Sequence, residues 1–201
     1  MSARSSVRRR EMLLAALACF TRHGVEATSI DMIREASGAS VGSLYHHFGN
    51  KEGLAAEVYL EGLRDFRQFL AEKLRPVTGL ESATRAIVHA NVDWICANPD
   101  WARFIFGYRM VLAKADRESD LQAETRDAQG TIITQLERLL APGQTLPWPP
   151  EVYQSLVIGP THDYARNWLE GRRQKPLADL RDVFADAAWK SLGLTTSGIA
   201  S

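Results

Sequence analysis

The sequence has few cysteines, no long hydrophobic run and no excess of either charge. Its two cysteines, Cys19 and Cys96, lie far apart, which argues against a disulfide framework or a zinc site. No apolar stretch approaches the roughly 20 residues that span a bilayer. The basic start leads straight into Glu11 without the pattern of a secretory signal. We therefore expect a cytoplasmic protein with no membrane partner, no metal and no cofactor.

The charges balance, with 24 Lys and Arg against 24 Asp and Glu, which argues against a protein that coats nucleic acid. Their distribution is uneven, because four arginines in "RSSVRRR" precede the first acidic residue, Glu11. Such a basic arm is suited to phosphate, and a solvated tail explains it equally well.

Apolar residues recur at helical spacing along most of the chain, and no period-2 stretch appears, which predicts an all-α fold of about nine helices. With 201 residues the chain can bury a full core. Gly159-Pro160 is expected to kink the eighth helix, because proline removes a backbone hydrogen bond. The expected helices span about residues 7–23, 30–37, 41–48, 51–75, 79–97, a sixth from 99, 119–140, 151–171 and 177–192.

The stretch "SGASVGSLYHHFGNKEGL", residues 37–54, contains a short helix with two distinct faces. Ser40 is its expected N-cap, and Gly38 permits the sharp turn before it. At 100° per residue, Val41, Leu44 and Phe48 lie on one face and are expected to anchor the helix, with Tyr45 at the edge. Two short helices joined by a glycine turn predict a helix-turn-helix unit, whose second helix enters the DNA major groove.

The outward face of this second helix has the chemistry that a DNA contact needs. The small residues Val41, Gly42 and Ser43 allow close approach to base edges. Phosphate oxygens can accept hydrogen bonds from Tyr45, His46 and His47, and Lys51 adds a cation.

The run "REMLLAALACFTRHGVEATSIDMIREASGASVGSLYHHFGNKEGL", within residues 8–54, resembles the DNA-binding domain of the tetracycline-repressor family of bacterial regulators. The resemblance depends on several parts in order: "AALACFTRHG", "TS" at the second helix, Ser40, "LY", "HF" and Lys51. Three positions depart from the family pattern: Arg34 and Ser37 replace the usual alanine, and Ala39 replaces valine.

The resemblance implies roles for individual residues. Phosphate contacts are expected from Thr28, Ser29, Tyr45, His47 and Lys51. Base contacts are expected from Val41, Gly42, Ser43 and His46, and Ser40 is counted with this DNA-binding set. It implies two domains, residues 1–50 for DNA binding and residues 51–201 for effector binding and dimerisation.

The resemblance also implies a homodimeric repressor on a palindromic operator, released by a small-molecule effector. The last two helices would form the dimer interface, and their apolar residues are Leu156, Val157, Leu169, Leu180, Val183 and Phe184. The effector is expected to be hydrophobic and neutral or weakly polar, since the middle helices contain aromatics and no cluster of like charges. The candidate pocket residues are Trp94, Phe104, Tyr108, His162, Tyr164 and Trp168. Ordinary core packing explains aromatic and apolar residues at this spacing as well.

Two other classes of protein stay open. An enzyme has little support, because His46 and His47 diverge by about 100° on a helix and no HExxH or nucleophile motif occurs. The second is a helical ligand-binding or interaction protein that has lost DNA binding, which Ser43, Tyr45 and Lys51 argue against.

Overall fold

The computed structural model describes residues 3–109, 115–140, 145–146, 148–195 and 198–199. Within these residues the chain forms ten α-helices, one 3-10 helix and two strands of two residues each. The predicted all-α fold is confirmed, with ten α-helices in the described residues where about nine helices were expected. The chain divides into two compact units, Met1–Arg64 with Asp100–Ala123 and Asp65–Pro99 with Glu124–Ser201.

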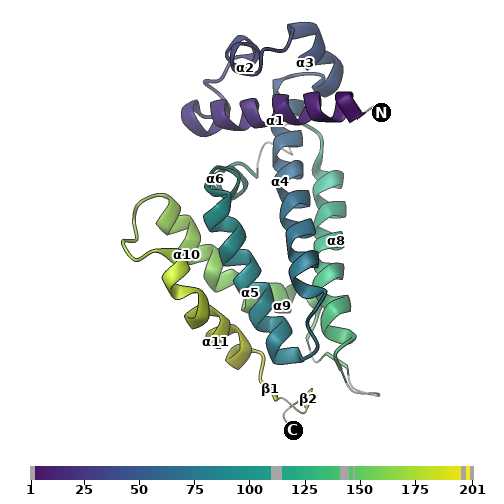
Figure 1. The fold of residues 1–201 in the computed structure, drawn as a ribbon, viewed down its shortest axis with the longest axis vertical. Coiled ribbons are helices and arrows are strands. Elements are labelled where there is room, and N and C mark those ends of the chain that lie inside the picture. Colours follow the sequence, from purple (N-terminus) through teal and green to yellow (C-terminus); the bar gives the residue numbers. More distant parts are fainter. Residues whose placement is uncertain (1–2, 110–114, 141–144, 147, 196–197, 200–201) are drawn as a thin grey trace. The chain divides into compact units, whose positions relative to one another are not determined.

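The first unit is built around its N-terminal helices, where α2 packs against α1 and α3 follows α2 (Figure 1). Phe20, Ile33 and Leu44 come from three different helices and are almost fully buried in its core. Phe104 extends this core, with its ring stacked on that of Phe20 at 5.7 Å. The helices that contribute to the first unit are α1 (Ala3–His23), α2 (Ile30–Ser37), α3 (Val41–Phe48), α4 (Lys51–Leu74), α6 (Pro99–Gly107) and α8 (Glu118–Glu137), of which α4 and α8 continue into the second.

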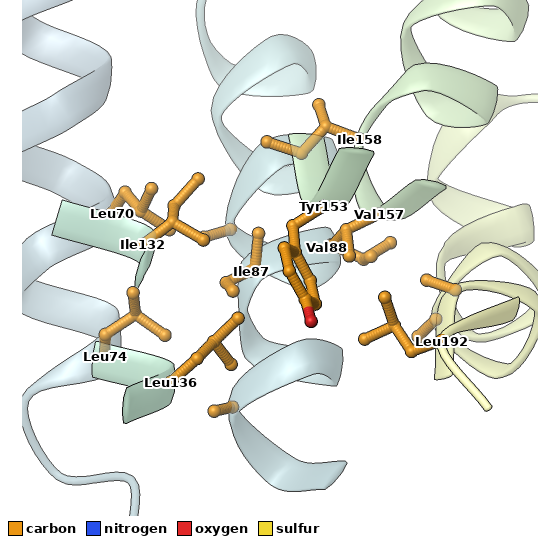
Figure 2. Close-up of a cluster of buried hydrophobic side chains, with 14 of the residues drawn as sticks. Leu70, Leu74, Ile87, Val88, Ile132, Leu136, Tyr153, Val157, Ile158 and Leu192 are labelled. Atoms are coloured by element: carbon orange, nitrogen blue, oxygen red, sulfur yellow. The ribbon is translucent and has the colours of Figure 1, made fainter. Parts of the chain in front are cut away.

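The second unit packs its remaining helices around one apolar cluster. Tyr153 is fully buried there, among Ile87, Leu136 and Val157 (Figure 2), and its hydroxyl accepts a hydrogen bond from the Trp148 N–H at 3.2 Å. Burial of the tyrosine raises the pKa of its hydroxyl. The further elements of this unit are α5 (Leu80–Ala97), α9 (Pro150–Val157), α10 (Gly159–Leu169), the 3-10 helix η1 (Leu177–Leu180), α11 (Arg181–Ser191), β1 (Leu194–Thr195) and β2 (Gly198–Ile199).

Three features of the second unit differ from the sequence prediction. The expected kinked helix over residues 151–171 is two helices, α9 and α10, which meet at Ile158, because Pro160 has no N–H and crowds the preceding turn. The expected helix over residues 177–192 begins as the tighter η1. After it, β1 and β2 pair antiparallel, with Leu194 opposite Ile199.

No helix in the described part of the chain combines the length and the apolar character that crossing a membrane requires. The sequence predicts two functional domains, residues 1–50 and 51–201. Their boundary differs from the boundaries of the two compact units, and the functional division stays a prediction.

Candidate DNA-binding surface

Serine side chains cap both short helices, α2 and α3, and the cap of α3 is the Ser40 predicted from the sequence. Ser29 precedes α2, and its hydroxyl accepts a hydrogen bond from the Met32 N–H at 3.2 Å. Gly38 ends this helix in the left-handed region, at φ 61°. Ser40 then caps α3, where its hydroxyl accepts from the Ser43 N–H at 3.1 Å. These local bonds define where each helix starts and form the tight turn of a helix-turn-helix unit.

Only part of the expected apolar face anchors α3. Leu44 and Phe48 are 1% and 9% exposed, and they hold the helix to the first unit. Val41 is 37% exposed, so the prediction that it anchors the helix is wrong. As the first residue of α3 it lies beyond the part of the core that covers Leu44, and its side chain is available to a partner.

Most of the residues predicted to contact DNA are accessible. Tyr45 is 49% exposed, on the side of α3 away from the core. The exposed members of the set are Ser29, Ser40, Val41, Gly42, Tyr45 and His46, and the half-buried members are Ser43, His47 and Lys51.

Gly42 has no structural need to be glycine. A Cβ atom built at this position would meet no atom within 4 Å, and the residue does not adopt a positive φ. The missing side chain therefore leaves open space on the outward face of α3, which is where a base edge or a sugar would approach.

Thr28 differs from the rest of the set because it is 1% exposed. Its hydroxyl is 2.7 Å from the carbonyl oxygen of Gly24 and 3.3 Å from that of Cys19, so its donor is used inside the fold. The expectation that its side chain contacts a phosphate does not fit this burial. Thr28 instead links the end of α1 to the loop that leads into α2.

Four further members of the set, Ser43, His46, His47 and Lys51, also have side-chain contacts within the protein. The ammonium group of Lys51 donates to the carbonyl oxygen of Glu26 at 3.0 Å, which links the start of α4 to the loop after α1. The hydroxyl of Ser43 lies 3.9 Å from the sulfur of Met12 on α1. The rings of His46 and His47 meet edge to face, with centroids 5.3 Å apart.

The N-terminal arginines have partners within the fold that sequence reasoning did not predict. Arg8 donates to the carbonyl oxygen of Gly38 at 2.8 Å, and the Arg9 guanidinium lies over the ring of Phe48. Arg9 also pairs with Glu57 on α4 at 2.6 Å. Glu57 could have been noticed in the sequence, since it is the only charged residue in the apolar run "LAAEVYL".

The six residues predicted for an effector pocket do not share one compact unit. Phe104 and Tyr108 belong to the first unit, where their rings stack at 4.9 Å. In the second unit, the Trp94 indole donates to Asp65 at 2.8 Å, and the Tyr164 hydroxyl donates to the carbonyl oxygen of Lys175 at 2.9 Å. The other two members of the second unit are His162 and Trp168.

Two surface hollows of about 390 and 380 Å³ are lined by residues outside the set predicted for the effector pocket. Ser6, Val7, Arg9, Arg10 and Glu61 line the first, and Gly79, Leu80, Glu81, Ser82 and Arg85 line the second.

The second unit contains a polar group formed by Asn91, Thr161 and His162. Only His162 is among the residues predicted from the sequence. The Asn91 amide nitrogen lies 3.0 Å from the His162 Nε2 atom. Asn91 is 2% exposed and Thr161 is 0% exposed, and among the residues that the structure describes neither the amide oxygen of Asn91 nor the hydroxyl of Thr161 has a hydrogen-bond partner. Desolvation, with a smaller contribution from Arg166, lowers the pKa of His162 to about 4. Its imidazole is therefore neutral at pH 7.

The residues predicted for a dimer interface fall into three groups. Val157 is 2% exposed within the apolar cluster, so it cannot contribute exposed area to an interface (Figure 2). Val183 is 59% exposed on α11. The half-buried members are Leu156, Leu169, Leu180 and Phe184.

These features define an all-α helix-turn-helix protein whose second short helix has an accessible outward face. Comparison with known proteins agrees: residues 12–58 match the family of bacterial regulatory proteins described as the tetR family. The match covers the part of the chain that forms α2 and α3, and it agrees with the resemblance of residues 8–54 to this family.

Two of the relatives by sequence are named as transcriptional repressors. The repressor AcnR of Corynebacterium jeikeium strain K411 is 34% identical over 89 residues, which are 43% of this chain and 44% of AcnR. The repressor KstR2 of Rhodococcus jostii strain RHA1 is 38% identical over 87 residues, 43% of this chain and 41% of KstR2. The chain thus spans less than half the length of the curated relatives it matches.

Solved structures share the fold across nearly the whole chain. A TetR family regulator from Marinobacter aquaeolei VT8 has a TM-score of 0.76 at 18% identity, over 95% of this chain and 98% of that one. The regulator FadR from Bacillus subtilis, solved in complex with stearoyl-CoA, has a TM-score of 0.69 at 14% identity, over 95% and 99%. At these identities the likeness concerns the fold alone.

Proposed function

We propose that this chain is a sequence-specific DNA-binding transcriptional regulator, a homodimeric repressor that leaves its operator when a small hydrophobic effector binds. The proposal is based on the outward face of α3. Leu44 and Phe48 hold the helix from behind, while Tyr45 is exposed beside the open space at Gly42. A helix held in this way can enter the DNA major groove.

The roles of the residues follow from their accessibility. Ser29 and Tyr45 contact phosphates, with His47 and Lys51. The hydroxyls of Ser29 and Ser40 accept backbone N–H groups and keep their own protons for a phosphate oxygen. Base edges are read by Val41, Gly42, Ser43 and His46. Thr28 supports this set from inside the fold.

The operator is palindromic, because a symmetric dimer presents two copies of α3. The half-sites lie one or more helical turns apart, at roughly 34–36 Å for each turn. The dimer forms through α10, η1 and α11, where Leu169, Leu180 and Val183 keep exposed or half-exposed area.

The effector binds in the residue 51–201 region, near the polar group of Asn91, Thr161 and His162. Two buried oxygens that lack a partner within the described part of the chain are costly in an apolar interior, and a ligand that supplies hydrogen bonds removes that cost. A neutral imidazole favours an uncharged ligand group. We expect an apolar molecule with a neutral polar group, acting in the cytoplasm.

Selection of bound duplexes from random DNA tests the function directly. The full chain should enrich a palindromic site, and Tyr45→Ala should weaken binding to all duplexes by about tenfold. Trp148→Ala is the control, since it removes an aromatic side chain of similar exposure, 50% against 49%, from the second unit.

Substitution of Ser43 or His46 should instead change which site is selected. If the wild-type chain enriches no site and binds duplex DNA with a salt slope near zero, the protein has lost DNA binding and its function lies elsewhere.

A further inference from the structure

Glu57 on α4 is a buried carboxylate with arginines from three segments of the first unit. Its Oε1 atom lies 2.6 Å from Arg9 on α1 and 2.8 Å from Arg64 on α4. Its Oε2 atom lies 3.2 Å from Arg117, which directly precedes α8. Glu57 is only 8% exposed. Burial by itself would raise its pKa, but the hydrogen bonds from Arg64 and Arg9 outweigh burial and hold the pKa below its ordinary value.

Arg9 also contacts the recognition helix. Its guanidinium carbon lies 5.6 Å from the centre of the Phe48 ring, a cation–π contact with the last residue of α3. Phe48 is one of the two side chains that anchor this helix. Arg9 therefore joins the C-terminal end of α3 to the carboxylate of Glu57.

We propose that Arg9 and Glu57 are positioning residues that hold the recognition helix α3 in the orientation for reading DNA, with Arg117 as a third arm of the same network. The proposal rests on the proposed function, since it assumes that α3 reads DNA. A buried carboxylate is costly without its cations, so Glu57 restricts where the Arg9 guanidinium can lie. Phe48 then packs against a fixed group instead of a mobile surface side chain.

The competing explanation is that the N-terminal arginines bind phosphate directly. The two explanations predict opposite signs for Glu57→Gln. If only charge matters, removal of a negative charge strengthens DNA binding. If Glu57 positions α3 through Arg9, the same substitution weakens binding, although the protein becomes more positive.

The first measurement is the affinity of the full chain for the best duplex from a randomised-site selection, labelled with fluorescein and titrated at several salt concentrations. Glu57→Gln and Arg9→Gln should each weaken binding by about tenfold. The double substitution should cost little more than either single one, because both remove the same link. Arg117→Gln should have a smaller effect, since it leaves the Oε1 atom of Glu57 paired.

Salt dependence separates positioning from phosphate contact. A lost phosphate contact lowers the log–log salt slope by about 0.9. Arg9→Gln should leave the slope unchanged, and Arg9→Lys, which keeps the charge without the planar guanidinium, should not restore the affinity. Arg10→Gln is the matched control: it removes the same charge one position later, from a side chain that pairs with Glu61 at 3.5 Å.

The second measurement does not depend on DNA. In hydrogen–deuterium exchange of the free protein, Glu57→Gln should speed exchange of the α3 amides, residues 41–48, while α5 in the second unit keeps its protection. This exchange measurement tests the proposal even if the randomised-site selection yields no duplex. Unchanged α3 exchange, or DNA binding strengthened by Glu57→Gln, would overturn it.

Discussion

The guanidinium of Arg8 donates a hydrogen bond to the carbonyl oxygen of Gly38, 2.8 Å away and thirty positions later in the chain. The bond links the first helix to the turn between α2 and α3. Turn carbonyls at a helix end usually lack a partner within the helix, so a charged donor is well placed there. The angle between the two short helices thus depends partly on α1.

Arg8→Gln should destabilise the turn between α2 and α3 and, through it, the fold. We expect a loss of about 0.5–1 kcal/mol in the free energy of unfolding, because the donor is partly exposed. The rate of amide exchange at residues 38–40 should rise by the factor that corresponds to this loss of free energy. Urea unfolding and hydrogen exchange measure the two effects.

Glu11→Gln is the matched control for Arg8. It removes the partner of the Arg8–Glu11 ion pair at 3.3 Å and leaves the bond to Gly38 in place. Exposed pairs contribute little, so the change should stay below about 0.5 kcal/mol. If Glu11→Gln loosens the turn as much as Arg8→Gln does, the bond to Gly38 is not what holds it.

The helix-turn-helix unit could be predicted from the sequence because its signals are local. Ser29 and Ser40 bond to N–H groups three residues away, and Gly38 adopts the positive φ that glycine favours. Such features depend on a few neighbouring residues and need no knowledge of the tertiary fold.

The sequence predictions fail where contacts with distant parts of the chain determine the structure. Helical periodicity predicts that Val41 lies on the buried face, but Val41 is 37% exposed, whereas Leu44 one turn later is 1% exposed. The resemblance implies a phosphate contact for Thr28, whose hydroxyl in the fold lies near the carbonyl oxygens of Cys19 and Gly24. The partners of Arg8 and Arg9 lie 30 or more positions away, so spacing in the sequence cannot reveal them.

Gly42→Ala should separate stability from DNA binding. Alanine favours the helix over glycine by up to about 1 kcal/mol, and its Cβ would meet no atom of the protein. The variant should therefore unfold at a higher urea concentration. Its affinity for a selected duplex should fall, because the added methyl group occupies the space that a base edge approaches.

Gly38→Ala provides the matched comparison at the turn. Its Cβ also meets nothing within 4 Å, but φ is 61°, where alanine is strained. This variant should be less stable by about 1 kcal/mol. If Gly42→Ala binds the duplex as tightly as wild type, the open space at Gly42 is not a contact region.

His162 should make the fold sensitive to mild acid. Its pKa is about 6.5 when unfolded and about 4 in the fold, so between these values the unfolded chain binds more protons than the folded protein. Stability must then fall as pH decreases through this window. The loss is at most about 3 kcal/mol, and less to the extent that residue 162 reaches the surface.

Urea unfolding between pH 7 and pH 4 measures this effect against His162→Gln, which can keep a hydrogen bond to Asn91 but cannot take up a proton. The difference in unfolding free energy between wild type and variant should shift in favour of the variant as pH falls, and level off near pH 4. His23→Gln, at an exposed position that ends α1, should instead follow wild type. If wild type and His162→Gln lose stability in parallel, the imidazole takes up its proton as readily in the fold as in the unfolded chain, and desolvation does not keep it neutral.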